Sequence, residues 1–491
     1  MKLLLVWLAG VLSCCEAYKI LVVYSLPGKS HSILGDGIVR HLLNDGHEVT
    51  YISPFTYKPA SPNLRLVDVS ANAELMNLEA IMNRRIDLQG HGLLIYMLSQ
   101  MVQMTIENEN VQKLLNDPNE RFDVVIVEWM FTELGFSAVF NCPLIWVSSV
   151  DVHWAILRLI DQPSNPAYSG DIHDSNLPPF SFGTRLVELY TQLKVIPNKY
   201  TYFIRGRTPP NYYDLQYNAS LVLANSHVSM GQAIALPQNY IPIGGYHIKE
   251  KVEPLPDDLK KILDRSKNGV IYFSMGSNLK SKDIPKEIKE SLFKMFGELK
   301  QTVLWKFEED LPNKPNNVHI LKWAPQPSIL CHPNTVVFIT HGGLLSTTET
   351  VHFGVPIIGI PVFGDQFTNV VRAVKRGIAL RVDLSYTMAD ELKQAINEIT
   401  SNPKYSQKVK ELSFIYHNRP VTPGQQLVHW VKHVIETRGA PHLRSPALAL
   451  PFYQRFYLDL VAYILIIVLV IMKLFQLLRS KSKRKQQYAV N

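Results

Sequence analysis

Short runs rich in apolar and β-branched residues recur along the chain, and most are followed by a polar loop and a stretch with helical spacing. Such runs are typical of buried parallel strands that crossover helices connect. They cover residues 20–24, 46–52, 123–127, 143–147 and 221–223 in the first half, and 270–273, 302–305, 318–321, 336–339 and 356–360 in the second. The pattern predicts an α/β protein with two Rossmann-like domains and a ligand pocket at the seam between them. Residues 181–211 are too irregular to assign.

A polar stretch with two prolines, residues 249–256, separates the two patterns and predicts a linker. We therefore expect an N-terminal domain over residues 18–248 and a C-terminal domain over residues 257–440. A juxtamembrane segment over residues 441–459 is expected to follow.

Two longer apolar runs predict targeting and membrane anchoring. Residues 1–17 have the charged, apolar and small-residue regions of a secretory signal, with a first buried strand or helix as the alternative. Residues 460–478 are long enough, at about 1.5 Å per residue, to cross a hydrocarbon core of about 30 Å. The basic tail, residues 479–491, should stay in the cytosol. We expect a single-pass type I protein of the endoplasmic reticulum membrane with lumenal domains; the plasma membrane is the alternative.

The charge does not indicate a nucleic-acid partner. The formal net charge is +8, but six basic residues lie between positions 473 and 485, so the large central part is nearly neutral.

After removal of the signal only the cysteines Cys142 and Cys331 remain, and we expect two small buried side chains rather than a disulfide framework. Asn218 begins the only glycosylation sequon, and its use stays open because it adjoins an apolar strand.

Unusual polar residues lie just after the apolar runs. Ligands of open α/β sheets bind outside the carboxyl ends of the strands, so one crevice can collect side chains from both halves. The residues in these positions are His31, Glu128, Ser277, Trp323, His341 and Asp365.

The turn His341-Gly342-Gly343 follows an apolar strand and opens a helix. Two glycines let backbone N–H groups approach a phosphate, and the helix N-terminus adds partial positive charge. Ser346 and Glu349 are three residues apart on that helix, where a carboxylate suits the two hydroxyls of a ribose. Taken alone, the motif is equally compatible with an ordinary tight turn.

Three neighbouring segments support a nucleotide-sugar site. Trp323 offers a ring for stacking on a base and Gln326 an amide for its edge or sugar, while Asp365 and Gln366 suit sugar hydroxyls. Ser277 ends another glycine loop. A core tryptophan and plain turn chemistry are the alternatives for single residues. Four such loops in succession favour the nucleotide-sugar interpretation.

Residues 323–366, which read WAPQPSILCHPNTVVFITHGGLLSTTETVHFGVPIIGIPVFGDQ, closely resemble the donor-binding signature of the UDP-glycosyltransferase family. Residues 273–277 (FSMGS) and 439–445 (GAPHLRS) resemble further stretches of its membrane-bound animal members. The resemblance extends in outline over the whole chain. It implies a GT-B fold, in which the N-terminal domain binds mainly the acceptor and the C-terminal domain the UDP-sugar.

The resemblance also implies contacts for each part of the donor. Trp323 would stack on uracil, while Gln326 and Glu349 would hold the base and ribose. The pyrophosphate would be surrounded by Ser277, His341, Gly342, Gly343 and Ser346, and the sugar hydroxyls would be held by Asp365 and Gln366. Leu345 departs from the family pattern, which often has an asparagine there and so one more polar contact.

Transfer of a sugar to a hydroxyl requires removal of the acceptor proton, a task suited to histidine. His31 resembles the family's catalytic base, and Glu128 matches the carboxylate that orients it, although the family more often has aspartate there. One base opposite the leaving group favours a single displacement that inverts the anomeric carbon. The chain has no Asp-x-Asp triplet, so we expect neither a metal ion nor a cofactor.

We therefore expect an enzyme that transfers a sugar from a UDP-sugar to the hydroxyl of a small lipophilic acceptor. UDP-glucose is the preferred donor because the chain resembles invertebrate members, and UDP-glucuronate is the alternative. Two rival functions stay open, a non-catalytic carrier that retains the UDP-sugar site and a phosphorylase-type enzyme. Acceptor identity and oligomeric state stay open as well, with a homo-oligomer as one option.

Overall fold

The computed structural model describes the chain except for residues 1–16, 76–90, 130–134, 161–164, 169, 171–175, 195–216, 232, 277–283, 310, 313, 456 and 490–491. The expected signal segment and Ser277 therefore lie outside the described residues. The chain forms two compact units, Met1–Leu443 and Arg444–Asn491.

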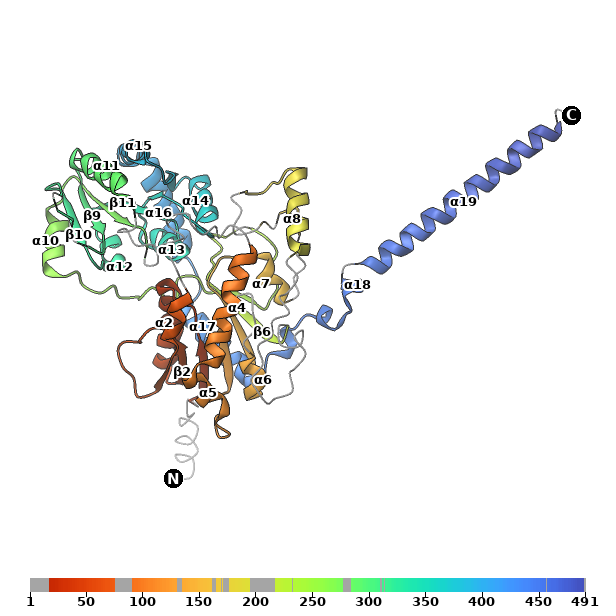
Figure 1. Ribbon diagram of the computed structural model, residues 1–491, viewed down its shortest axis with the longest axis horizontal. Coiled ribbons are helices and arrows are strands. Elements are labelled where there is room, and N and C mark those ends of the chain that lie inside the picture. Colours follow the sequence, from red (N-terminus) through yellow and green to blue (C-terminus); the bar gives the residue numbers. More distant parts are fainter. Residues whose placement is uncertain are drawn as a thin grey trace, which may run out of the picture. The chain divides into compact units, whose positions relative to one another are not determined.

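A parallel sheet of seven strands forms the N-terminal half of the first unit (Figure 1). Its strand order is β3-β2-β1-β4-β5-β6-β7, so β1 and β4 are neighbours. The strands are β1 (Lys19–Val23), β2 (Glu48–Ser53), β3 (Leu64–Asp68), β4 (Val124–Glu128), β5 (Leu144–Ser148), β6 (Ala219–Ala224) and β7 (Tyr240–Pro242). The helices are α2 (Lys29–Asn44), η1 (Ser70–Leu75), α4 (His91–Glu107), α5 (Glu109–Asn116), α6 (Phe136–Phe140), α7 (Trp154–Leu159) and α8 (Phe182–Lys194).

A second parallel sheet, of six strands, forms the C-terminal half with the order β10-β9-β8-β11-β12-β13. The strands are β8 (Val270–Ser274), β9 (Thr302–Lys306), β10 (Val318–Leu321), β11 (Thr335–Thr340), β12 (Ile357–Gly359) and β13 (Ala379–Arg381). The helices are α10 (Asp257–Arg265), α11 (Lys286–Gly297), α12 (Gln326–Leu330), α13 (Leu344–Phe353), α14 (Gln366–Lys375), α15 (Met388–Ser401) and α16 (Lys404–His417). Each half thus has the doubly wound arrangement expected from its apolar runs.

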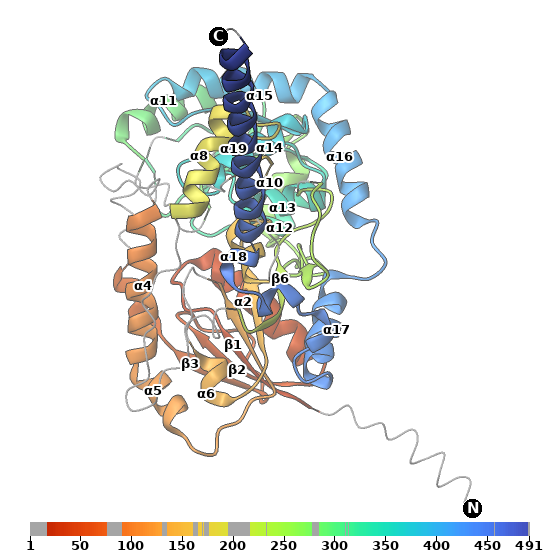
Figure 2. The same cartoon turned by 90° about the vertical axis from the view of Figure 1, so that its right-hand side faces the viewer.

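Helix α17 (Pro423–Glu436) returns to the first sheet, beside α2 (Figure 2). Its Leu427, Val431 and Val434 are buried in the same core cluster as Ile20 and Val22 of β1. By packing, this helix belongs with the N-terminal sheet, whereas the sequence placed residues up to 440 in the C-terminal domain. Helix η3 (Pro441–Leu443) also contacts β6 of that sheet.

Helix α8 occupies part of the range that the sequence left unassigned. Its Phe182, Leu186 and Tyr190 are exposed, while Glu188 and Gln192 are buried. This arrangement is the reverse of the usual amphipathic helix, whose apolar face is buried.

Cys142 is half-buried against the N-terminal core, and Cys331 is exposed. The expectation that both cysteines are buried is therefore wrong for Cys331, which directly follows the short helix α12.

The second unit contains η4 (Pro446–Ala449), α18 (Phe452–Arg455) and α19 (Leu458–Ala489). Within α19, the 24 residues Leu458–Lys481 are long and apolar enough to cross a membrane, and none of them is buried against protein. They include the segment 460–478 that the sequence predicts as the membrane span.

Candidate active site

His31 and Glu128 meet at the carboxyl end of the N-terminal sheet. His31 lies in the first turn of α2, which follows β1, and Glu128 is the last residue of the neighbouring strand β4. The His31 Nδ1 is hydrogen-bonded to Glu128 Oε1. The His31 side chain keeps 23% of its surface exposed, whereas the Glu128 side chain keeps 1%. Because Nδ1 is held by the carboxylate, Nε2 is the ring nitrogen that carries the lone pair for chemistry.

Ser149, which directly follows β5, donates a hydrogen bond from Oγ to the same Glu128 oxygen. Glu128 Oε2 has no hydrogen-bond partner among the described residues. The carboxylate is thus fixed by two contacts on one oxygen. Ser149 was not predicted as a site residue, although its position directly after an apolar strand is the same signal that His31 and Glu128 share.

The surroundings of His31 act on its basicity in opposite directions. Burial lowers the pKa of His31, but the charge and hydrogen bond of Glu128, together with the charge of Asp365, raise that pKa above its ordinary value of 6.5. Asp365 belongs to the C-terminal half, directly before α14. One carboxylate from each half of the unit, Glu128 and Asp365, thus raises the pKa of the His31 imidazole.

A second polar cluster lies at the carboxyl end of the C-terminal sheet. Gln326 Nε2 donates hydrogen bonds to Glu349 Oε2 at 2.6 Å and to Ser346 Oγ at 3.3 Å. The Tyr272 hydroxyl donates to Gln326 Oε1 at 3.2 Å. The structure thus brings three of the predicted donor residues together. Tyr272 was missed, because a tyrosine inside a strand looks like ordinary core.

The N-terminus of α13 lies beside two glycine turns. Gly343 is its N-cap, and among the described residues no side chain caps this end. A Cβ on Gly276 or Gly343 would come within 2.5 or 2.6 Å of the His341 ring, so both positions need glycine to admit the imidazole. Burial, aided by the positive charge of Lys306, lowers the pKa of His341 to about 4. A neutral His341 next to an uncapped helix start can donate one hydrogen bond to an anion.

The remaining predicted donor residues differ in their surroundings. Trp323 is 62% exposed, so it is not a core tryptophan. Asp365 Oδ2 accepts a hydrogen bond from Asn369 Nδ2 at 2.9 Å, and the same amide reaches the Gly342 carbonyl at 3.2 Å. Gln366 Oε1 accepts from the backbone N–H groups of residues 362 and 363. Its amide oxygen therefore holds the loop that precedes α14.

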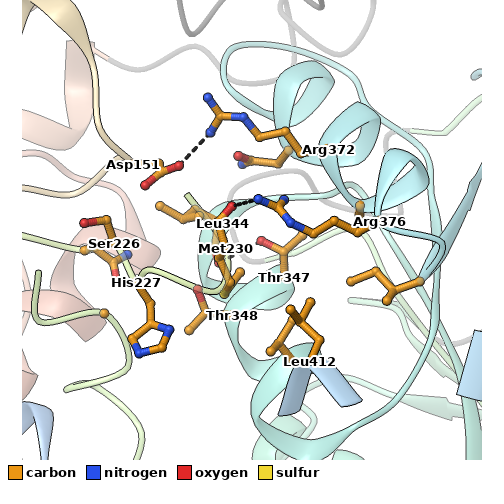
Figure 3. Close-up of a pocket in the computed structure, with 16 residues that line it drawn as sticks. Asp151, Ser226, His227, Met230, Leu344, Thr347, Thr348, Arg372, Arg376 and Leu412 are labelled. Carbon is orange, nitrogen blue, oxygen red and sulfur yellow. Dashed lines mark hydrogen bonds and ion pairs between the residues drawn. The ribbon is translucent and has the colours of Figure 1, made fainter. Parts of the chain in front are cut away.

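Side chains of α14 contact the N-terminal half in a pocket that is also lined by Leu344, Thr347 and Thr348 of α13 (Figure 3). These residues lie on the face of α13 opposite to Ser346 and Glu349. Arg372 Nη1 is 2.6 Å from Asp151 Oδ2, and both side chains are nearly buried. Arg376 donates to the Met230 carbonyl and, at 2.8 Å, to the Gly231 carbonyl. These contacts fix the C-terminal half against the N-terminal half. None of these contacts was predicted from the sequence.

Comparisons with known proteins decide the family. A profile described as "UDP-glucoronosyl and UDP-glucosyl transferase" matches residues 190–486. The chain is 32% identical to UDP-glucosyltransferase 2 of Dactylopius coccus over 484 residues, which cover 95% of this chain and 93% of that protein. The chain belongs to the UDP-glycosyltransferase family. It is also 33% identical to the Homo sapiens UDP-glucuronosyltransferase 2B15 over 265 residues, 51% of this chain and 49% of that protein.

Solved structures give the fold. One is a complex between a UDP-glucosyltransferase from Polygonum tinctorium, capable of glucosylating indoxyl, and 3,4-dichloroaniline. It matches with a TM-score of 0.58 at 17% identity, over 86% of this chain and all of that chain. The predicted GT-B fold and the predicted class, a UDP-glycosyltransferase enzyme, are thus confirmed.

Proposed function

We propose that this UDP-glycosyltransferase moves a sugar, preferably glucose, to the hydroxyl of a small lipophilic acceptor with inversion at the anomeric carbon. The observation that carries the proposal is the His31–Glu128 pair, whose imidazole also feels the charge of Asp365 from the donor side. His31 of the N-terminal half and Asp365 of the C-terminal half are thus close enough to interact, as a base and a sugar-binding carboxylate at one reaction centre must be.

In the proposed reaction His31 Nε2 takes the proton from the acceptor hydroxyl as its oxygen forms a bond to the anomeric carbon. The bond from that carbon to the UDP oxygen breaks, and UDP leaves with the electron pair. Glu128 holds the imidazole tautomer and stabilises the imidazolium that forms, the role of the third member of a catalytic triad. Ser149 keeps the carboxylate in place through its hydrogen bond.

The C-terminal residues are proposed to bind the donor in sequence from base to sugar. Trp323 stacks on the uracil, Gln326 and Glu349 hold the base and ribose, and Asp365 and Gln366 hold the sugar hydroxyls. The pyrophosphate is held by His341, Gly342, Gly343, Ser346 and the start of α13, with Ser277 proposed from the sequence alone. Protein donors in these positions supply the charge stabilisation that the leaving UDP needs, so we propose no metal ion and no cofactor.

The choice of glucose rests on relatives. Relatives that match more than 90% of this chain include UDP-glucosyltransferase 2 and UDP-glycosyltransferase UGT5 of Dactylopius coccus and the ecdysteroid UDP-glucosyltransferases of two nuclear polyhedrosis viruses. UDP-glucuronate is the second candidate, because mammalian glucuronosyltransferases also match. Two are 33% identical over about half of the chain, and UDP-glucuronosyltransferase 2B7 of Homo sapiens is 26% identical over 88% of it.

We also propose that the helix Leu458–Lys481 anchors the enzyme in the endoplasmic reticulum membrane with residues 18–443 in the lumen. Its length and composition support a membrane span, and the basic residues that follow support a cytosolic tail. Asn218 is exposed directly before β6, which supports its use as a glycosylation site in that compartment.

Identification of the conjugate formed from each UDP-sugar tests this proposal. Membranes that contain the full chain are incubated with UDP-glucose or UDP-glucuronate and a set of phenols, and the conjugate is characterised by NMR. We expect a β-glucoside together with equimolar UDP. An α-linked product would refute the single displacement, and conjugates formed only from UDP-glucuronate would refute the donor assignment.

A further inference from the structure

His247 is a buried histidine that neither the catalytic pair nor the donor residues include. It follows β7 in the turn before the expected linker, and its side chain is 2% exposed. Its Nε2 lies 3.6 Å from Glu349 Oε1. Neither ring nitrogen has a hydrogen-bond partner among the described residues. A buried polar group without a partner is costly, so such a group in a native structure calls for an explanation.

The backbone around His247 is fixed to α2, the helix that carries His31. Arg40 Nη2 donates to the Tyr246 carbonyl at 2.7 Å, and the same guanidinium reaches the His247 carbonyl at 3.3 Å. The Gly37 backbone also lies close to His247, since a Cβ there would come within 3.1 Å of the His247 Cα. The backbone of His247 is therefore held by the N-terminal half, while its imidazole reaches toward Glu349 of the C-terminal half.

Glu349 is held on its other oxygen by its own half. Gln326 Nε2 donates to Oε2 at 2.6 Å, so Oε1 is the oxygen that faces His247. The separation of 3.6 Å exceeds a hydrogen bond, which for N–H···O is about 2.7–3.2 Å. A shift of roughly half an ångström between the side chains would complete the contact.

We propose that His247 is a positioning residue for the nucleotide ribose. Its Nε2–H donates to Glu349 Oε1 when the donor is bound, while Gln326 holds Oε2. With one donor fixed on each oxygen, the remaining lone pairs of the carboxylate are directed at the two ribose hydroxyls. The proposal rests on the proposed ribose role of Glu349, and it adds that the N-terminal half completes the nucleotide site.

The test compares two ligands that differ only at the ribose hydroxyls. Membranes that contain the full chain are assayed for binding of UDP and of 2′,3′-dideoxyuridine 5′-diphosphate, by competition against radiolabelled UDP. His247→Ala removes one hydrogen bond to a charged group and should weaken UDP binding about 10-fold or more. The dideoxy ligand should bind the variant and the unchanged enzyme equally, because it has no hydroxyls for Glu349 to hold.

Two further readouts separate positioning from damage to the fold. His247→Gln places an N–H close to the Nε2 position and should recover most of the UDP affinity. In turnover assays His247→Ala should raise the KM for the UDP-sugar with little change in kcat, since His31 is untouched. The matched control is His332→Ala, which removes a histidine paired with Asp264 at 3.0 Å outside the site and should leave both affinities unchanged.

The outcomes distinguish this inference from the proposed function. An equal loss of affinity for both ligands in His247→Ala and His247→Gln, or no loss for either, overturns the role of His247. Glu349→Ala serves as the reference. If Glu349→Ala lowers the affinity for UDP but not for the dideoxy ligand, while His247→Ala changes neither affinity, the positioning role of His247 fails and the ribose role of Glu349 stands. If Glu349→Ala lowers both affinities equally, the ribose role of Glu349 fails and the inference falls with it.

Discussion

Replacing Glu128 by glutamine removes the charge beside His31 and keeps nearly the same shape. The hydrogen bond between them lies in a site where the carboxylate is almost fully buried. A hydrogen bond to a charged group contributes about 1.5–3 kcal/mol, so loss of the charge should lower kcat about 10- to 150-fold at neutral pH. The effect should not be smaller than this, since the imidazolium that forms in the transition state loses its counter-charge.

The same variant should also move the pH profile in a definite direction. A general base must be neutral, so kcat/KM rises as pH increases through the pKa of His31. In the unchanged enzyme Glu128 raises that pKa against the lowering effect of burial. Without the charge of Glu128, burial prevails and the acidic limb of the profile should move to lower pH, while the plateau falls.

The assay is the rate of conjugate formation between about pH 5 and 9, the range in which a histidine base titrates. Glu298→Gln is the matched control, because Glu298 pairs with Lys393 at the surface, far along the sequence from both catalytic residues. A profile of Glu128→Gln that stays in place or moves to higher pH would refute the account of His31 basicity. An unchanged plateau would refute the role of the carboxylate.

Three further substitutions test other parts of the site. Ser149→Ala removes one donor to the catalytic carboxylate, and at about 1 kcal/mol it should lower kcat roughly five-fold with unchanged donor KM; a changed KM alone would contradict this. Gly276→Ala places a Cβ 2.5 Å from the His341 ring at a φ of +85° and should weaken UDP binding and lower the melting temperature, which calorimetry and UDP titration would check. Arg372→Ala leaves the nearly buried Asp151 without its partner and should cost about 3–5 kcal/mol of unfolding free energy. A double variant that also carries Asp151→Ala should lose less than the sum of the two single losses, and a loss equal to that sum would contradict the pairing.

The central strands could be predicted because they are buried on both faces and therefore read as continuous apolar runs. The edge strand β3 could not, since Leu66 is exposed and Arg65 interrupts the pattern. Helix α8 was not predicted, because residues 181–211 as a whole show no regular pattern that marks where a helix begins and ends. The position of α17 was missed for another reason, since an amphipathic pattern shows that a helix packs on a core without showing which sheet provides it.

The candidate site divides in a similar way. His31 and Glu128 were singled out by their positions after apolar strands, and Gln326, Ser346 and Glu349 by their positions in the loops and helix that follow such strands. The resemblance to the family supplied the role proposed for each of them. Ser149, Tyr272 and His247 were not found, because a serine after a strand, a tyrosine in a strand and a histidine in a turn all occur without any functional role. Their importance depends on contacts between residues far apart in sequence, for example the 54 residues that separate Tyr272 from Gln326.

The most direct test of the mechanism is to measure transfer and donor binding together in His31→Ala. A general base contributes about 10²- to 10⁴-fold, so the rate of conjugate formation should fall by at least about 100-fold. The affinity for UDP should stay unchanged, because His31 is not among the residues proposed to bind UDP. Full transfer activity in this variant would contradict the assignment of His31 as the base.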